Sequence, residues 1–224
     1  INFALLGCSR ISSQHIKAIR ELEDRCTLTD ICDINNEALE RVRLETDAKP
    51  FNKFEDMLQS TSADCIIITT PNGLHAQHAL SAFGSGFNVV TEKPMATNVR
   101  DAENMIEACA KYKKKLFVVK QVRFSKSIQM IKEAMDKNRF GKVYMVNLNL
   151  FWTRPQEFYD SADWRGSIEM DGGTLLNQGS HYIDVINWLF GPISEVSAMN
   201  ATLGRDIESE DSSIMNLKLK EDTL

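Results

Sequence analysis

The sequence predicts an α/β protein with a doubly wound parallel sheet, followed by an α+β domain whose sheet is predominantly antiparallel. Three observations predict this fold. The strand-like segments of the first half are apolar runs without polar alternation, which is typical of strands buried on both faces. A helix-like segment follows each of them. After about Lys120 the pattern changes, so we place the domains at residues 1–120 and 121–224.

The first half alternates predicted strands and helices. The strands are expected at residues 3–6, 28–32, 65–68, 88–90 and 116–119. The helices are expected at residues 15–22, 36–45, 74–83 and 100–110. Because parallel strands are joined by right-handed crossovers, this order indicates a Rossmann sheet with helices on both of its faces.

The second half has longer elements. Helices are expected at residues 127–137 and 174–190, the second stopped by Gly191 and Pro192. Strands are expected at 143–151, which alternates in polarity, and at 195–202 and 213–220, with a polar, aromatic loop over 153–173. The chain stops at Leu224, just after a strand. We therefore expect the native protein to continue and this chain to be truncated at its C-terminus.

Composition limits the class of protein. The net charge of -5 and the pI near 5.5 do not favour a nucleic-acid partner, which requires clustered Lys and Arg. Five cysteines without a C-x-x-C pair are typical of reduced thiols in a cytoplasmic protein. No apolar run is long enough for a membrane span, and no secretory pattern opens the chain at Ile1.

The first strand-to-helix turn is a candidate pyrophosphate site. It reads GCSRIS from Gly7, so the first glycine of G-x-G-x-x-G is present and Ser9 and Ser12 replace the other two. Asp33 ends the second strand, where an acidic side chain binds the adenosine ribose and disfavours a 2′-phosphate. The pattern therefore favours NAD over NADP. An alternative is that Asp33 caps the helix that begins near Asn36.

Two later strand ends lie at the same carboxyl edge of the predicted sheet, where ligands of open α/β sheets bind. They carry TTPN from Thr69 and TEKP from Thr91. His75 and His78 lie three residues apart on the helix that follows the first of these. No further metal ligands are evident nearby, so we favour capping and packing for both histidines and expect no metal site.

These residues resemble the glucose–fructose oxidoreductase/inositol dehydrogenase (Gfo/Idh/MocA) family over essentially the whole chain. The resemblance rests on Gly7, Asp33, the Thr70-Pro71-Asn72 triplet with His75, the Glu92-Lys93-Pro94 triplet, and Gly172-Gly173 leading to NQGSH from Asn177. Family members are longer than this chain, which supports the expectation that it is truncated. The resemblance implies an NAD(P)-dependent sugar dehydrogenase. It also implies a homo-oligomer, a dimer or tetramer, that assembles through an open sheet of the second domain.

The resemblance assigns candidate ligand-binding residues. Cofactor-binding positions are expected at Gly7, Ser9, Arg10, Ile11, Asp33, Thr70, Pro71, Asn72, His75, Glu92, Lys93 and Gln121. Substrate-binding positions are expected at Lys93, Lys120, Arg123, Arg154, Trp164, Arg165, Asn177 and His181. A substrate with a pyrophosphate and a carboxylate needs forked donors such as these arginines. Trp152 and Trp164 could pack on a sugar or base, or pack within their own domain.

Oxidation of an alcohol needs a hydride acceptor and a proton acceptor. His181 is the natural proton acceptor, and Lys93 would orient the hydroxyl and favour its alkoxide. Lys93 could itself titrate if it were desolvated. Many family members carry Asp four residues before the histidine, but this chain has Asn177, which cannot stabilise an imidazolium by charge. Lys93 could therefore carry more of the proton transfer.

Several segments resemble a narrower branch, the WlbA/WbpB-like enzymes that oxidise UDP-N-acetylglucosaminuronate at C3 in surface-polysaccharide, including lipopolysaccharide, biosynthesis. They are VVKQ from Val118, FWTRPQ from Phe151, WRG from Trp164, and Asn177-Gln178. Two alternatives remain at this stage. One is a dehydrogenase of a free sugar or polyol such as an inositol. The other is an NAD(P)-sensing regulator without turnover, although such a sensor has no need for both Lys93 and His181.

Overall fold

A computed structural model describes residues 1–220 of the chain. The chain divides into two units, Ile1–Val119 and Lys120–Leu224, which are described separately below. The last four residues of the predicted second domain, 221–224, lie outside the described residues.

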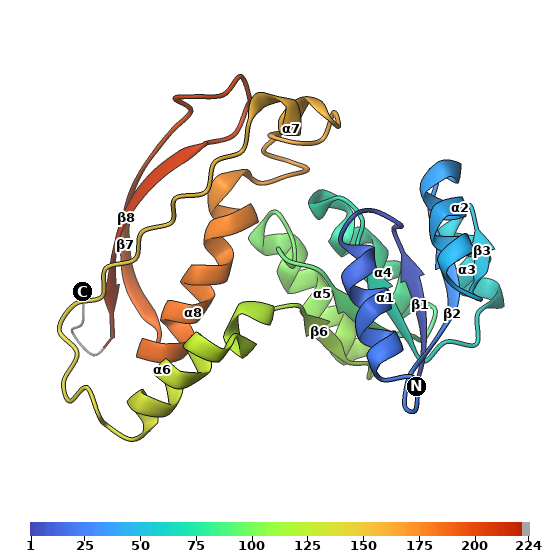
Figure 1. Cartoon of the computed structure of the whole chain (residues 1–224), viewed down its shortest axis with the longest axis horizontal. Helices are drawn as coiled ribbons and strands as arrows, with labels where there is room; N and C mark the ends of the chain where they lie inside the picture. Colours follow the sequence, from blue (N-terminus) through green and yellow to red (C-terminus); the bar gives the residue numbers. More distant parts are fainter. Residues whose placement is uncertain (221–224) are drawn as a thin grey trace. The chain divides into compact units, whose positions relative to one another are not determined.

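The first unit is built on a parallel sheet of six strands in the order β3-β2-β1-β4-β5-β6 (Figure 1). The strands are β1 (Asn2–Leu6), β2 (Thr27–Cys32), β3 (Lys49–Phe51), β4 (Cys65–Ile68), β5 (Asn88–Thr91) and β6 (Leu116–Val118). The strand order reverses between β1 and β4, which pair directly. Their carboxyl ends therefore form the crevice where an open α/β sheet binds its ligand.

Helices cover both faces of this sheet, as predicted. They are α1 (Ser12–Glu21), α2 (Asn36–Glu45), α3 (Phe54–Ser60), the 3-10 turn η1 (Asn72–Leu74), α4 (His75–Gly84) and α5 (Val99–Lys111). Alternate strand residues face opposite ways. Leu5, Ile31 and Ile67 belong to a core that includes residues of α1 and α2. Ile66 and Ile68 belong to a second core, which includes residues of α3, α4 and α5.

Two elements of this unit were not predicted from the sequence. Strand β3 has three residues, lies at the sheet edge and contains Pro50, so it lacks the apolar run that marks the other strands. Helix α3 has only seven residues, which are too few to show a helical period. All the strands and helices that the sequence predicted for this unit are confirmed, with small differences at their ends.

The second unit contains helices and a two-stranded antiparallel sheet, which confirms the predicted change to an α+β pattern (Figure 1). Its elements are η2 (Gln121–Phe124), α6 (Lys126–Asp136), α7 (Gln156–Asp160), the π-helical turn η3 (Leu175–Gly179), α8 (Ser180–Phe190), β7 (Ile193–Ala201) and β8 (Ser212–Leu219). Gly191, at φ +94°, ends α8 where the sequence predicted a stop.

The predicted strand at 143–151 is wrong. These residues form no strand in the structure. Their alternating polarity would need one side to pack on a core, but Tyr144, Met145 and Phe151 are 71%, 70% and 94% exposed. Since Tyr144 and Met145 are neighbours, residues at both odd and even positions face solvent, and the ladder that defines a strand does not form.

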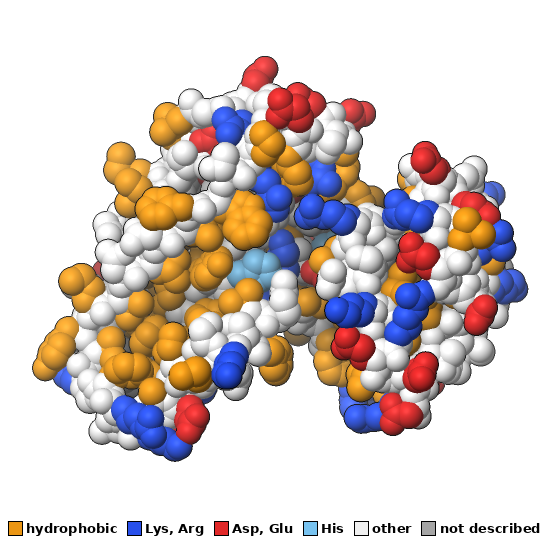
Figure 2. All heavy atoms as spheres, viewed as in Figure 1, with side chains coloured by type: hydrophobic (Ala, Val, Ile, Leu, Met, Phe, Trp, Pro, Cys, Tyr) orange, Lys and Arg blue, Asp and Glu red, His pale blue; other side chains and the backbone are white. Residues whose placement is uncertain are grey.

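Figure 2 shows hydrophobic side chains gathered on the face of the second unit that it displays. Met199 and Ile214, which face each other across β7 and β8, are 78% and 72% exposed. Within residues 1–220 no helix has both the length and the apolar character that a membrane span requires. All five cysteines are free thiols, as predicted.

Candidate functional site

The turn after β1 approaches β4 as closely as backbone allows. Gly7 has a φ of +98°, and its N–H donates to the carbonyl of Cys32 at 2.8 Å. A Cβ at Gly7 would lie 2.8 Å from the carbonyl carbon and oxygen of Thr69. Only glycine therefore fits this turn, for both conformational and steric reasons. A turn of this shape leaves room for a pyrophosphate beside the backbone.

Asp33 closes the same turn from the end of β2. Its Oδ2 accepts from the Cys8 N–H at 2.6 Å, and its Oδ1 accepts from the Asn35 N–H at 2.8 Å. The alternative that Asp33 caps α2 is wrong, because Asn35 is the N-cap and accepts from Glu37 and Ala38. Each carboxylate oxygen has a second lone pair, so Asp33 can still bind ribose hydroxyls.

The N-terminus of α1 carries the remaining predicted turn residues. Ser9 donates to the carbonyl of Thr69 at 3.2 Å, while Arg10 and Ile11 are exposed. No side chain among residues 1–220 caps α1. The Ser12 and Gln14 N–H groups donate to the carbonyls of Ser9 and Ile11, and the dipole of the helix N-terminus favours an anion. Arg41, which the sequence analysis did not select, donates to the carbonyl of Cys8 at 2.5 Å. These features fit a bound dinucleotide.

The end of β4 leads into the two histidines. Thr70 and Pro71 precede η1, which begins at Asn72. His75 is fully buried, with Nδ1 2.8 Å from the carbonyl oxygen of Pro94 and Nε2 2.9 Å from that of Thr70. Burial lowers the pKa of His75, although both carbonyls oppose this shift. The ring is therefore neutral and donates to one of the two carbonyls at a time.

His78 has a packing role as well. Its Nδ1 lies 3.0 Å from the Thr70 hydroxyl, and its ring packs edge-on against Phe54 with centroids 5.4 Å apart. Burial lowers the pKa of His78 to about 4. Both histidines therefore pack within the first unit, as the sequence predicted. Within residues 1–220 no cluster of His, Cys, Asp or Glu is arranged to hold a metal ion.

Glu92 holds the backbone that carries Lys93. The Glu92 side chain is buried, and its Oε1 lies 2.8 Å from His15 Nε2 on α1. Its Oε2 accepts from the Lys93 N–H at 3.2 Å. Burial alone would raise the pKa of Glu92. The hydrogen bond and charge of His15, together with the N–H and charge of Lys93, outweigh burial, so the pKa of Glu92 is lowered. Lys93 thus lies between Glu92 and Pro94, whose carbonyl contacts His75.

Three predicted residues lie at the start of the second unit. Lys120 Nζ is 3.5 Å from the carbonyl oxygen of Ser180, and burial lowers the pKa of Lys120. Gln121 begins η2 and is exposed. Arg123 forms two hydrogen bonds of 2.6 Å with Asp184 on α8. The structure therefore uses Arg123 to anchor α8, and its proposed contact with substrate stays a prediction.

His181 lies in the first turn of α8 and is buried. The π-helical turn before it carries Asn177, whose Nδ2 donates to Asp171 Oδ1 at 2.6 Å. Two glycines with positive φ, Gly172 and Gly173, connect Asp171 to this turn. A Cβ at Gly173 would overlap the Glu210 carboxylate, which accepts from the Leu175 N–H at 2.9 Å. The double glycine thus lets Glu210 bind the backbone at the start of this turn.

The polar loop predicted at 153–173 forms a stack of alternating cations and rings. The Arg154 guanidinium lies 4.4 Å from the Phe158 ring centre and 5.2 Å from that of Trp152. Arg165 lies 4.1 Å from the same Phe158 ring and 4.8 Å from Trp164. Phe158 is therefore shared by both arginines. Trp164 contacts Arg165, and Trp152, which is 56% exposed, contacts Arg154.

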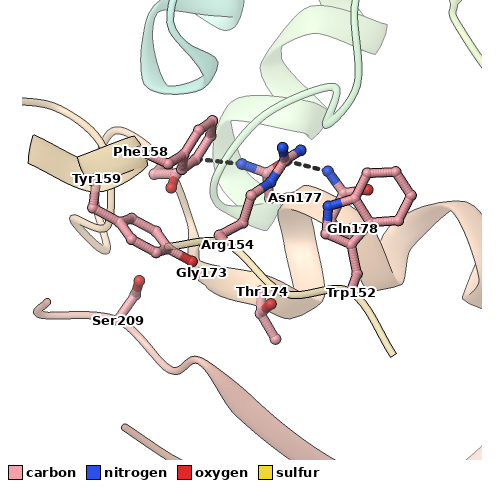
Figure 3. A pocket seen from close by; sticks show the side chains of 10 residues that line it. Trp152, Arg154, Phe158, Tyr159, Gly173, Thr174, Asn177, Gln178 and Ser209 are labelled. Carbon is pink, nitrogen blue, oxygen red and sulfur yellow. Dashed lines mark hydrogen bonds between the residues drawn. The ribbon is translucent and has the colours of Figure 1, made fainter. Parts of the chain in front are cut away.

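A pocket of the second unit opens beside this stack (Figure 3). Its lining residues are Trp152, Arg154, Phe158, Tyr159, Asp171, Gly173, Thr174, Asn177, Gln178 and Ser209. The dashed lines mark two hydrogen bonds among these residues, from Asn177 Nδ2 to Asp171 and from Gln178 Nε2 to Asn177 Oδ1. The sequence analysis selected Arg154, Trp152 and Asn177 as candidate ligand contacts, and it named Gly173 and Gln178 only as members of motifs. It did not single out the other lining residues. Phe158 and Tyr159 could have been found from their place in the aromatic loop, whereas Ser209 lies far along the chain.

Two family models together match nearly the whole chain. One, described as "Oxidoreductase family, NAD-binding Rossmann fold", matches residues 1–120. The other, described as "GFO/IDH/MocA C-terminal domain", matches residues 128–224.

Solved structures resemble the whole chain. The WlbA dehydrogenase from Chromobacterium violaceum, in complex with NADH and UDP-GlcNAcA, is 48% identical with a TM-score of 0.97, and covers 100% of this chain and 65% of its own. The WlbA dehydrogenase from Bordetella pertussis, in complex with the same two ligands, is 47% identical with a TM-score of 0.97, over 100% of this chain and 64% of its own.

A more distant relative has another substrate. The scyllo-inositol 2-dehydrogenase (NADP(+)) IolW of Bacillus subtilis is 30% identical over 154 residues, which are 68% of this chain and 42% of that protein. The chain thus spans less than two thirds of the length of each of these three relatives.

Proposed function

Because the chain belongs to the GFO/IDH/MocA oxidoreductase family, we propose that it is part of an NAD-dependent nucleotide-sugar dehydrogenase. The proposed reaction oxidises a secondary hydroxyl, at C3, of a UDP-linked N-acetylglucosaminuronate. The two WlbA structures, which are 48% and 47% identical to this chain over the aligned residues, hold UDP-GlcNAcA and NADH. This similarity favours a nucleotide sugar over a free polyol.

One observation of the structure carries the catalytic part of the proposal. The backbone around Lys93 is held at the carboxyl edge of the sheet, by Glu92 on one side and by the contact of Pro94 with His75 on the other. Glu92 in turn contacts His15 on α1, the helix that begins at the dinucleotide turn. A lysine placed this firmly beside a cofactor turn is suited to act on a substrate rather than to be a surface cation.

The proposed chemistry has two parts. A bound nicotinamide accepts the hydride from the carbon, so that NAD becomes NADH. His181 accepts the hydroxyl proton, and Lys93 donates a hydrogen bond to the same oxygen and favours its negative charge as the carbonyl forms. The C–H and O–H bonds break, the carbonyl π bond forms, and the proton remains on His181 until it is lost to water.

The second unit supplies the proposed substrate contacts. Arg154 and Arg165 have planar guanidinium groups whose forked donors match a phosphate or a carboxylate. Both guanidinium groups lie over the ring of Phe158, which holds their positions in the loop. Lys120 and Asn177 complete the proposed set, and Trp164 supports Arg165.

The experiment is a single-turnover assay with the enzyme in stoichiometric excess over the sugar, so that one reduction of NAD per sugar molecule is visible. UDP-N-acetylglucosaminuronate, UDP-N-acetylglucosamine, scyllo-inositol and myo-inositol are compared by NADH absorbance and by thermal shift with NAD present. The proposal expects NADH with the UDP-uronate and the largest thermal shift with the same compound. Reduction only with an inositol would replace it with the polyol function, which the similarity to IolW favours.

We also propose a cytoplasmic homo-oligomer, a dimer or tetramer. Met199 and Ile214 form an exposed cross-strand pair, and burial of such a pair against a second copy removes apolar surface from water. Sedimentation of the wild type and of Met199→Lys tests this interface. A monomeric wild type, or a variant that assembles as before, would contradict it.

A further inference from the structure

Asp171 is a buried carboxylate with both oxygens engaged. It is 3% exposed, its Oδ2 accepts from the Gly166 N–H at 2.9 Å, and its Oδ1 accepts from Asn177 Nδ2 at 2.6 Å. A carboxylate this deeply buried is costly unless its hydrogen bonds and its charge are used.

Asn177 lies four residues before His181, and its amide carries no charge. It lies in the π-helical turn η3, and His181 lies in the first turn of α8, which follows directly. Side chains four residues apart share one side of a helix. The negative charge that this position lacks is nevertheless present one hydrogen bond further away, on Asp171.

We propose that Asp171 is a positioning residue for His181, acting through Asn177. This inference rests on the proposed function, in which His181 accepts the hydroxyl proton. Asp171 fixes the Asn177 amide and supplies the negative charge that stabilises the imidazolium once the proton has moved from the substrate oxygen to the ring.

The orientation of the amide follows from its contacts. Because Nδ2 donates to Asp171, Oδ1 points away from the carboxylate, and it accepts from Gln178 Nε2 at 3.2 Å (Figure 3). The charge of Asp171 also affects the pKa of another side chain that lines this pocket. Burial, followed by the charge of Asp171, raises the pKa of Tyr159 on α7.

Other charged groups near His181 already have assigned partners. Asp184 lies three residues further along α8, but the fork of Arg123 binds both of its oxygens at 2.6 Å. Lys120 Nζ is 3.5 Å from the carbonyl oxygen of Ser180 and adds positive charge. The charge of Asp184 raises the pKa of Lys120 against the effect of burial, so this carboxylate already acts on the cations beside it. Asp171 is a further carboxylate, and it lies one hydrogen bond from Asn177.

The test moves the carboxylate from one position to the other. Asp171→Asn keeps the shape and removes the charge. We expect kcat to fall by roughly 10- to 100-fold, as when a group that orients a functional histidine is lost. The acid limb of the kcat/KM profile should move to lower pH, because an imidazolium without its negative neighbour loses its proton more readily. The double variant Asp171→Asn/Asn177→Asp restores a carboxylate and should recover both kcat and the pH profile.

Asn177→Leu keeps the Asp171–Gly166 contact and removes the amide, so it should reproduce the loss of kcat and the shift of the pH profile. Melting temperature and NAD binding are measured for every variant, so that a folding defect is separated from a positioning defect. An unchanged pH profile in Asp171→Asn or, if that variant does not fold, in Asn177→Leu overturns the inference. A folded double variant without recovery also overturns it.

His181→Gln separates this inference from the proposed function. If His181→Gln keeps wild-type activity, His181 is not the proton acceptor and the proposed mechanism fails together with the inference. If His181→Gln is inactive while Asp171→Asn keeps both wild-type kcat and the wild-type pH profile, the proposed function stands and the role of Asp171 alone is wrong.

Discussion

The two units hold their functional groups in different ways. In the first unit, backbone groups and buried polar atoms fix the site. Gly7 packs against the Thr69 carbonyl, Asp33 binds the Cys8 N–H, and Glu92 binds the Lys93 N–H. In the second unit the two candidate substrate-binding arginines are held by another side chain, because Arg154 and Arg165 both lie over the ring of Phe158.

The difference has a physical consequence. A group held by backbone moves only when the fold moves, so a change beside it should alter catalysis or cofactor binding strongly and locally. A group held in a stack of side chains shares its support with neighbours, so a single change should be partly compensated. The first arrangement suits a chemical step that every substrate shares. The second suits recognition of one particular anionic substrate.

The largest effect is expected at Lys93. Lys93→Ala removes the hydrogen-bond donor that the proposed reaction uses at the substrate oxygen, so kcat should fall by about 10²- to 10⁴-fold. NAD binding, measured by fluorescence titration, should persist, because the Glu92 and His75 contacts involve the backbone of this segment rather than the lysine side chain.

Lys115→Ala is the matched control. Lys115 is an exposed lysine of the same unit, and its hydrogen bond to Asn88 uses its backbone N–H, which alanine keeps. This variant should behave as the wild type. A Lys93→Ala enzyme with most of its activity would remove Lys93 from the mechanism and break the contrast between the units.

The next effect is expected at Gly7. Gly7→Ala combines a φ of +98° with a Cβ placed 2.8 Å from Thr69 backbone atoms that cannot rotate away. Backbone strain of this kind costs about 1–3 kcal/mol, so NAD affinity should fall by roughly 10- to 100-fold as the turn shifts.

Gly86→Ala separates the two causes. Gly86 has a similar φ of +90° in the same unit, but nothing lies within 4 Å of its added Cβ. It should lower the melting temperature without changing NAD affinity. Equal NAD affinities of the two variants would mean that the close approach of Gly7 to β4 has no part in the cofactor site.

Asp33 tests whether charge or shape sets the choice of cofactor. Asp33→Asn keeps an oxygen acceptor for the Cys8 N–H and removes the charge that repels a 2′-phosphate. The ratio of NADP to NAD dissociation constants should shrink by roughly tenfold. If both cofactors lose affinity equally, Asp33 supports the turn and does not read the ribose.

Much of the first unit could be predicted because its signals are local. The β1, β4 and β5 segments contain continuous apolar runs, and the Glu92-Lys93-Pro94 triplet directly follows the last of them. Strand β3 was missed because an edge strand of three residues with a proline carries no such run. His15 was missed because its partner Glu92 lies on another element, far along the chain, and no period connects them.

The second unit was harder to predict, because its structure depends on contacts between distant side chains. Residues 143–151 alternate in polarity as a strand does, but among residues 1–220 no strand pairs with them. The helix predicted at 174–190 has a π-helical turn at its start, which hydrophobic periodicity does not distinguish from an α-helix. Asp171 was missed because its link to Asn177 crosses the two glycines before that turn.

The smallest effect is expected at the arginine stack, and it tests the compensation expected of the second unit. Arg154→Met and Arg165→Met each keep an apolar stem against Phe158 and remove one guanidinium. A half-buried ion pair with the substrate contributes about 1 kcal/mol, so each variant should raise KM for the UDP-uronate by about fivefold. KM for any neutral sugar and the melting temperature should stay nearly unchanged.

The double variant Arg154→Met/Arg165→Met tests whether the two arginines bind the same substrate anion or act independently. If the two guanidinium groups share Phe158 and substitute for one another at the substrate anion, the double variant should raise KM by more than the product of the single effects. A product of the single effects means that each arginine has its own partner. If no variant changes KM for an anionic substrate, the stack is only structural, and the nucleotide-sugar proposal loses the donors that distinguish it from a polyol dehydrogenase.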